Sequence, residues 1–194
     1  MTWEDNLALA RMADRAGMEA LLPVGRWKGY GGESNFNNRT FESLTWAAAV
    51  AAVTNYSTIF STVHAPVIHP VAAAKMAATI DHVSNGRFAL NLVAGWFQDE
   101  FDMFGVNLAP HDERYDYAAE WLTLVKRLWR EEDMFDFDGK YFQGQGLWSQ
   151  PKPLQSPRPP IMNAGSSETG HVFSARHADM NFAMLRQKDA DSDR

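Results

Sequence analysis

The sequence predicts an α/β fold built on a parallel sheet that helices cover on both faces. Two observations support this prediction. Helical patterns and short apolar segments alternate along the 194 residues, and the apolar segments are continuous, as in strands that are buried on both sides. Two architectures fit this pattern: an open doubly wound sheet, and an incomplete (β/α)8 TIM barrel with about five of its eight strands.

The N-terminal half of the chain alternates between helix and strand. Apolar residues at helical spacing predict a helix over 3–16 that ends at Gly17, and the apolar run 20–24 follows as a buried strand. The stretch 25–40 is rich in Gly, Asn and Arg, so we expect a loop there. The next expected elements are a helix over 41–53, a strand over 57–63, a helix from His69-Pro70 to about Val83 and a strand over 88–93.

The C-terminal half continues the pattern around one long irregular segment. We expect a loop through Pro110 and then a strongly amphipathic helix over 115–130. Residues 131–160 hold five prolines, which predicts an extended insertion rather than part of the core. A single partial barrel domain over 1–194 is completed by a strand over 161–163, a helix over 168–175 and a last strand over 180–185.

Composition excludes several functional classes. Hydrophobic residues make up 45% and charged residues 22% of the chain, as in ordinary globular proteins. The net charge of −6 offers no basic surface for nucleic acid, and no apolar run is long enough to cross a membrane. The absence of cysteine excludes a thiolate nucleophile, a disulfide framework and a cysteine-based metal site. We therefore expect a soluble, cytoplasmic protein.

The histidines predict no metal site. His64 and His69 are five residues apart across a strand-to-helix turn, which is not a recognised spacing for metal ligands, and no nearby acid completes a site. Both are interpreted more simply as packed or hydrogen-bonded side chains.

The residues that follow the predicted strands are the first candidates for a binding site, because ligands of parallel α/β proteins bind at the carboxyl ends of the strands. These segments are rich in Gly, Trp, Asn and Ser, which favours a polar aromatic cofactor over a metal ion. They comprise 23–28, 64–69, 91–100, 164–167 and the residues from 185 onward.

Two helix starts are candidate phosphate sites. The segment 164–168 (AGSSE) places small residues and two hydroxyls at a helix N-terminus, where free N–H groups attract anions. The segment 111–115 (HDERY) places Asp112 at a helix N-cap and Arg114 in the first turn, where a guanidinium can bind phosphate. An ordinary helix cap explains each segment equally well.

Three acids follow the third predicted strand and are candidates for acid–base chemistry. Glu100 is the best functional candidate among them. Asp99 and Asp102 fit a solvated loop.

Several blocks of the sequence resemble a known enzyme family. They are similar to the bacterial-luciferase-like flavin-dependent monooxygenases, and within these to the pyrimidine, dimethyl-sulfide and alkanesulfonate monooxygenases. The blocks are HPVAAAKMAATIDHVSNGRFALNLVAGW over 69–96, DEFDMFG over 99–105, HDERYDYAAEW over 111–121 and SPRPPIMNAGSSETGHVFSARHADMNF over 156–182.

The resemblance implies a two-component monooxygenase on a (β/α)8 barrel, and a homodimer. Such an enzyme takes reduced FMN from a separate NAD(P)H:flavin reductase. The flavin reacts with O2 to form a C4a-(hydro)peroxyflavin, which transfers one oxygen atom to a small organic substrate. Two alternatives remain open: a flavin- or deazaflavin (F420)-dependent oxidoreductase of the same superfamily, and a non-catalytic flavin-binding fragment.

The resemblance also implies which residues form the site. His64 ends the second predicted strand and is expected to contact the substrate or the peroxide, and Trp27 and Trp96 are expected near the flavin. The implied flavin contacts are Gly25, Arg26, Asn91, Glu100, Arg114, Tyr115 and Ser167.

Two positions depart from the family pattern. The pyrimidine enzymes have Ile-Lys where this chain has Gly25-Arg26, which argues against a pyrimidine substrate. The common threonine before Gly-Trp is replaced by Ala94, so one hydroxyl near the flavin is missing.

Overall fold

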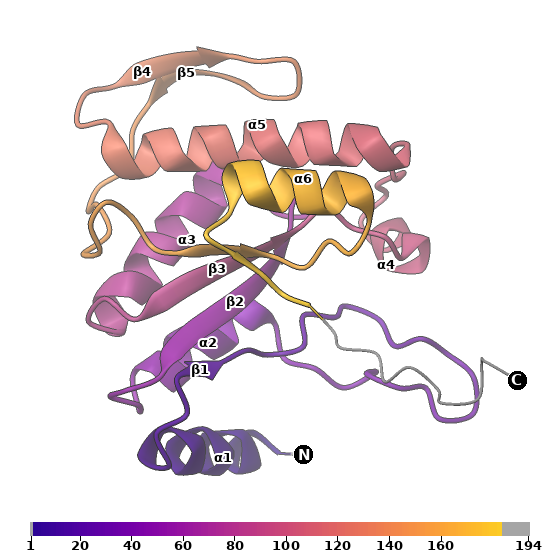
Figure 1. Ribbon diagram of the computed structural model, residues 1–194, viewed down its shortest axis with the longest axis vertical. Coiled ribbons are helices and arrows are strands. Elements are labelled where there is room, and N and C mark those ends of the chain that lie inside the picture. The colour runs from indigo at the N-terminus through magenta and orange to yellow at the C-terminus, as the bar shows by residue number, and fades with distance from the viewer. Residues whose placement is uncertain (1, 184–194) are drawn as a thin grey trace, which may run out of the picture.

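A five-stranded parallel sheet forms the centre of the protein, whose computed structural model describes residues 2–183 (Figure 1). Each strand lies beside the one that precedes it in this sheet, without the reversal of order that defines a doubly wound sheet. The barrel alternative is therefore confirmed, as a curled half-barrel. The strands, in spatial order, are β1 (Ala20–Leu21), β2 (Thr58–His64), β3 (Phe88–Val93), β6 (Ile161–Asn163) and β7 (Met180–Asn181).

The ends of two predicted strands differ from the structure. The first strand, expected over 20–24, is reduced to the two residues of β1. The strand expected over 180–185 is present as β7, and its last two positions, 184 and 185, lie outside the described residues.

The helices share one apolar core on a single face of the sheet. This core contains Ala10, Ala47, Trp121 and Phe173 from four different helices, together with strand residues such as Leu90. The expectation of helices on both faces is wrong for residues 2–183, because a curled sheet turns its second face inward. That face carries a small cluster of Phe60, Ala89 and Met162. The main helices are α1 (Trp3–Arg15), α2 (Ser43–Ala51), α3 (Pro70–Val83), α5 (His111–Arg130) and α6 (Glu168–His177).

Strand alternation decides which side chains face the concave side of the sheet. On β2, Ile59 and Val63 enter the helix-covered core, so Thr62 and His64 point to the opposite face. On β3, Asn91 has the same orientation, because Leu90 and Leu92 belong to the core. The fold therefore gathers polar side chains from neighbouring strands on its concave face.

The ends of α3 confirm two local predictions. His69 is the N-cap residue, and its imidazole accepts a hydrogen bond of 3.3 Å from the backbone N–H of Val71, while Pro70 occupies the first turn. After the helix, Asn85 and Gly86 adopt positive φ angles of 54° and 79°, which only residues tolerant of the left-handed region support well.

The start of α5 corrects a predicted cap. The helix begins at His111 rather than at 115, and its N-cap residue is Pro110. Asp112 therefore lies in the first turn and is not the N-cap. A short helix, α4 (Gln98–Asp102), also occupies part of the segment expected to be a loop.

The proline-rich insertion is more ordered than expected. It contains an antiparallel hairpin of β4 (Phe135–Asp138) and β5 (Gln143–Leu147), and Phe142 enters the main core. Glu120 of α5 holds this hairpin, because its carboxylate accepts hydrogen bonds of 2.8 Å from the backbone N–H groups of Tyr141 and Phe142. The prediction of an extended insertion outside the core is therefore wrong. The contact with α5 that places the hairpin against the core joins distant residues, so the local sequence does not reveal it.

Candidate functional site

A cavity of about 690 Å³ opens at the carboxyl ends of β1, β2, β3 and β6. Its volume lies in the range of small-molecule sites, roughly 300–1,000 Å³. Polar side chains from several strand ends converge on it, as expected at this edge of a parallel sheet. Seven of the eight predicted site residues line its wall: Gly25, Arg26, His64, Asn91, Arg114, Tyr115 and Ser167.

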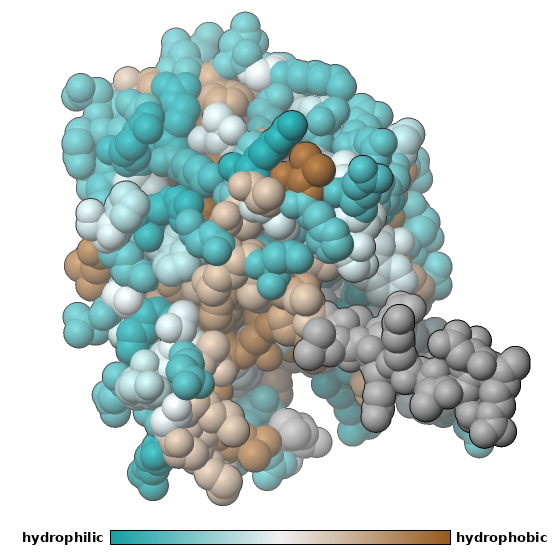
Figure 2. Space-filling model, in the orientation of Figure 1, coloured by the Kyte–Doolittle hydropathy of each residue, from teal (hydrophilic) through white to brown (hydrophobic). Residues whose placement is uncertain are grey.

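A second cavity of about 730 Å³ lies between α1 and the segment that contains β1. Its wall is mainly apolar and includes the exposed side chains of Leu9, Met12 and Met18. Figure 2 shows pale-brown side chains extending over the lower part of this face, toward α1. The seven predicted site residues all lie in the first cavity, which also holds the converging polar groups, so that cavity is the candidate site.

Asn91 presents a free acceptor to the cavity. Its side-chain amide donates a hydrogen bond of 3.1 Å to the hydroxyl of Thr62. Its Oδ1 atom is buried and finds no hydrogen-bond partner within residues 2–183. A buried acceptor without a partner costs about 1–3 kcal/mol, so a ligand N–H at this position would be bound favourably.

Gly25 brings the loop after β1 close to β2. A Cβ atom at this position would lie 2.7 Å from the Cβ atom of Thr62. Any side chain would therefore push the loop away from the sheet, and this close approach requires glycine.

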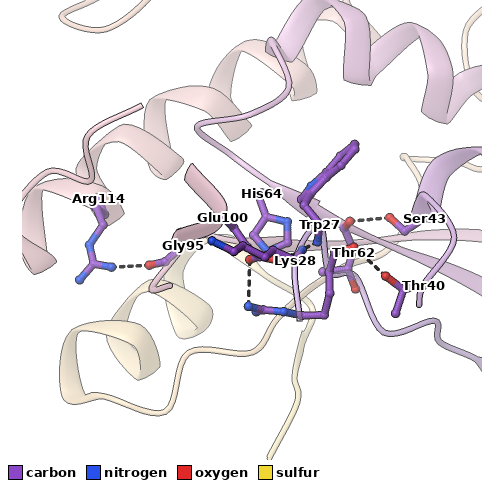
Figure 3. A network of polar contacts seen from close by, with 10 residues as sticks. Trp27, Lys28, Thr40, Ser43, Thr62, His64, Gly95, Glu100 and Arg114 are labelled. Carbon is purple, nitrogen blue, oxygen red and sulfur yellow. Dashed lines mark hydrogen bonds and ion pairs between the residues drawn. The ribbon is translucent and has the colours of Figure 1, made fainter. Parts of the chain in front are cut away.

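Arg114 bridges α5 and the loop after β3. Its guanidinium donates a hydrogen bond to the backbone carbonyl of Gly95, a glycine with a φ angle of +92° (Figure 3). The Nε–H of Arg114 is buried and has no partner in the part of the chain that the structure describes. The guanidinium is thus fixed in the wall with donor capacity left for a ligand.

Tyr115 and Ser167 form the end of the cavity beside α6. The hydroxyl of Tyr115 packs so tightly that a Cβ atom on Gly165 or Gly170 would lie 2.7 Å from it. Ser167 is the N-cap of α6, and its hydroxyl accepts a hydrogen bond of 3.1 Å from the N–H of Gly170. The helix N-terminus and the guanidinium of Arg114 together suit an anionic group.

Glu100 lies behind the wall, on α4, and is buried with 1% of its surface exposed. Its carboxylate accepts hydrogen bonds from the backbone N–H groups of Trp27 (2.6 Å) and Lys28 (3.3 Å). The second oxygen lies 3.0 Å from Nη2 of Arg26 and 3.9 Å from Nε2 of His64. Figure 3 shows this carboxylate between the loop after β1 and the end of β2.

Arg26 is enclosed by aromatic rings. Its guanidinium carbon lies 4.7 Å from the ring centre of Tyr30, 5.2 Å from that of Trp96 and 5.1 Å from that of Phe97. Cation–π contacts of this kind stabilise a guanidinium that has lost most of its water. The aromatic rings and Glu100 therefore hold one positive charge at the wall of the cavity.

His64 is a neutral imidazole at neutral pH. Burial lowers its pKa to about 4, and the positive charge of Arg26 lowers it too, while Glu100 opposes the shift. The side chain can therefore donate one hydrogen bond and accept another in the cavity.

Sequence reasoning missed some of the residues around the cavity. Thr62 and Tyr30 both line it. The strand alternation that selects His64 also selects Thr62, whereas nothing in the loop 25–40 distinguishes Tyr30. Of the two tryptophans expected near the flavin, Trp96 lines the cavity, whereas Trp27 packs edge-on against Phe104 with ring centres 5.1 Å apart, outside this wall.

Two kinds of structural feature are absent from residues 2–183. None of the helices in this range is long and apolar enough to span a membrane. Within the same range, the histidines and acids form no group of three or more that could bind a metal ion.

Comparison with known proteins gives one consistent family. The family model described as "Luciferase-like monooxygenase" matches residues 1–193. The pyrimidine monooxygenase RutA of Pseudomonas savastanoi pv. phaseolicola (strain 1448A / Race 6) is 39% identical over 185 residues, which cover 93% of this chain and 50% of RutA. The chain thus spans about half the length of that relative.

Solved structures agree with this comparison. A riboflavin lyase, RcaE, solved with modified FMN and its substrate riboflavin, superposes with a TM-score of 0.86 and 24% identity, over 96% of this chain and 48% of that one. The monooxygenase RslO1 from Streptomyces bottropensis gives a TM-score of 0.71 and 29% identity, over 84% of this chain and 47% of its own.

Proposed function

Because the chain belongs to the luciferase-like monooxygenase family, we propose that its cavity binds reduced FMN and that the complete barrel inserts one oxygen atom of O2 into a small organic substrate. The observation that carries this proposal is the set of buried, unpartnered polar atoms in one wall. Within residues 2–183, Oδ1 of Asn91 and Nε of Arg114 lack partners, and both residues line the same cavity.

The wall offers separate places for the two ends of a flavin mononucleotide. Asn91, Gly25 and Arg26 suit the polar ring system, because they combine a free acceptor, a close backbone approach and a positive charge. Arg114, Tyr115 and Ser167 suit the phosphate, together with the N-terminus of α6. We include Glu100 in the same site through its contacts with Arg26 and with the loop that follows.

The chain's own contribution to the reaction is orientation and control of protons. When bound, reduced flavin supplies the two electrons with which one oxygen atom enters the substrate and the other leaves as water. His64 is assigned as the catalytic residue that faces the reacting atoms, because it lines the cavity and stays neutral at neutral pH. A neutral imidazole can hold a proton at one nitrogen and accept one at the other.

Three finer proposals complete the function. A separate NAD(P)H:flavin reductase supplies the reduced FMN, as the family resemblance implies. The enzyme is a homodimer, as the family resemblance implies, and acts in the cytoplasm, as the composition of the sequence leads us to expect. The oxygenation reaction is proposed for the complete barrel, since this chain covers 50% of RutA.

The test is an anaerobic titration of the 194-residue chain with reduced FMN, followed by quenching of tryptophan fluorescence. Trp96 lies in the wall and serves as the reporter, which a Trp96→Phe variant checks. We expect saturable binding with a Kd of roughly micromolar strength. The double variant Asn91→Ala with Arg114→Ala should weaken binding by about a hundredfold, because two buried polar contacts are lost.

A matched control carries Asn55→Ala with Arg130→Ala, the same residue types at exposed positions outside the cavity. Equal binding by the control and by the cavity variant would refute this site. A parallel titration with reduced F420 decides between cofactors. Tighter binding of the deazaflavin than of FMN would favour the hydride-transferring alternative over the monooxygenase.

A further inference from the structure

One buried carboxylate organises the loop after β1 without lining the cavity. The Glu100 side chain is 2% exposed, and its contacts reach three consecutive residues of that loop. It binds the backbone N–H groups of Trp27 and Lys28, and it pairs with the guanidinium of Arg26. This carboxylate therefore fixes both the path of the loop and the position of its charged side chain.

Arg26 is the part of this arrangement that reaches the cavity. It lines the wall with 9% of its surface exposed. Its Nε and Nη2 atoms make no hydrogen bond of good geometry within the described residues, although Nη2 lies 3.0 Å from the carboxylate of Glu100. The charge of Arg26 is thus desolvated, and its ion-pair partner among residues 2–183 is Glu100.

We infer that Glu100 is a positioning residue, which holds Arg26 in the cavity wall and sets how much positive charge a bound flavin meets there. This inference rests on the proposed function, because it assumes that a flavin occupies the cavity. Glu100 acts through Arg26 and through the backbone of residues 26–28. It is not assigned a contact with the flavin itself.

The charge balance of the wall gives the inference a measurable consequence. A Glu100→Gln substitution keeps the shape of the side chain and an oxygen that can accept from Trp27, but it removes the counter-charge of Arg26. The guanidinium then remains buried and unpaired, which is unfavourable for folding. The wall also gains one net positive charge, which favours anionic ligands over neutral ones.

His64 provides a second, independent reporter of the same change. Its imidazole lies 3.9 Å from the carboxylate of Glu100 and 5.8 Å from the ring of Phe101. The negative charge of Glu100 raises the pKa of His64, against the effects of burial and of Arg26. Loss of that charge should therefore lower the pKa of His64 further.

The experiment compares reduced with oxidised FMN, which share the phosphate but differ at the ring system, because the ring of reduced FMN carries a negative charge at neutral pH and that of oxidised FMN is neutral. Both are titrated into the wild-type chain, the Glu100→Gln variant and an Asp99→Asn control. Asp99 is the adjacent acid, its side chain is 60% exposed, and it pairs with Lys28 rather than Arg26. We expect Glu100→Gln to raise the ratio of reduced to oxidised FMN affinity by roughly three- to tenfold, and Asp99→Asn to change it by less than about twofold.

Two further measurements do not require flavin binding. An NMR titration of His64 should give a lower pKa in Glu100→Gln than in wild type or Asp99→Asn. In urea unfolding, the free energy of unfolding of the double variant Arg26→Gln with Glu100→Gln should be closer to that of wild type than the value for Glu100→Gln alone. The reason is that the double variant leaves no unpaired buried charge.

The outcomes separate this inference from the proposed function. An unchanged affinity ratio together with an unchanged pKa of His64 would overturn the positioning role, and so would additive effects of the two substitutions on unfolding. If the wild-type chain binds neither flavin, the proposed cofactor site fails for this chain. The unfolding cycle then still decides whether Glu100 pairs with Arg26, and the His64 titration still decides whether Glu100 supplies negative charge at the wall.

Discussion

The buried imidazole of His64 makes the free energy of unfolding depend on pH between about pH 4 and pH 6.5. Its pKa lies at about 4 in the folded protein, compared with 6.5 for an ordinary histidine. As the pH falls through 6.5, the unfolded chain takes up a proton that the folded chain does not bind. Stability is therefore lost progressively between pH 6.5 and about pH 4, and the loss attributable to this group is complete below that value.

The size of this loss follows from the difference between the two pKa values. At about 1.4 kcal/mol for each unit of pKa, the change amounts to about 3 kcal/mol. The imidazole is 5% exposed, so solvent screening reduces this figure little. Since small domains are stable by about 5–15 kcal/mol, this single group accounts for a substantial part of the acid sensitivity.

The assay is urea unfolding of wild type and of His64→Gln at several pH values between 7.5 and 4. Glutamine has similar polarity and does not titrate, so the difference between the two unfolding free energies isolates the histidine. We expect this difference to shift by about 3 kcal/mol against wild type over the range. The control is His171→Gln, at an exposed histidine on α6, which should follow wild type at every pH.

Parallel curves for wild type and His64→Gln would refute the reasoning. Such a result would mean that the folded protein accepts a proton on His64 as readily as the unfolded chain does. The neutral imidazole assigned to the site would then be wrong as well.

Three further predictions concern the framework around the site. Gly25→Ala forces a Cβ atom to within 2.7 Å of Thr62, so urea unfolding should show a loss of about 1–3 kcal/mol, and an unchanged midpoint would contradict the close packing. Asp81→Ala removes a fully buried carboxylate that accepts a hydrogen bond of 2.7 Å from the backbone N–H of Leu154. Thermal unfolding should show a destabilisation of about 2–5 kcal/mol, and little change would mean that this contact is dispensable. Glu120→Ala should accelerate hydrogen exchange over residues 135–147 but not in β3, and uniform acceleration would count against the local role of Glu120.

Much of the fold is encoded locally and could be predicted from the sequence. The strand over 88–93 is found at its predicted bounds, because a continuous apolar run buried on both sides leaves few alternatives. The end of α3 was equally predictable, since Asn85 and Gly86 tolerate the left-handed backbone that terminates the helix.

The missed elements depend on contacts between distant residues. The hairpin β4–β5 is held by Glu120, whose partners lie about twenty residues further along the chain. Nothing within 131–160 reveals that contact. The start of α5 differs from the prediction for another reason, because Pro110 serves as the N-cap residue without a side-chain hydrogen bond.

For the candidate site too, some features could be predicted from the sequence and others depend on contacts between distant residues. Strand ends and family resemblance together placed seven residues in one cavity wall. They did not distinguish residues that line the wall from residues behind it. Glu100 is separated from Trp27 by 73 positions in the sequence, so its place behind the loop follows from the packing of α4 alone.

The short strand β1 ties the integrity of the cavity to a weakly paired edge of the sheet. Only Ala20 and Leu21 pair with β2, yet the loop that follows supplies Gly25 and Arg26 to the wall. Amide protons at this edge should therefore exchange with solvent earlier than those of β3. Because the same segment forms this edge and part of the cavity wall, detachment of the edge also opens the pocket. A ligand that binds both sides of the wall should therefore slow this local unfolding.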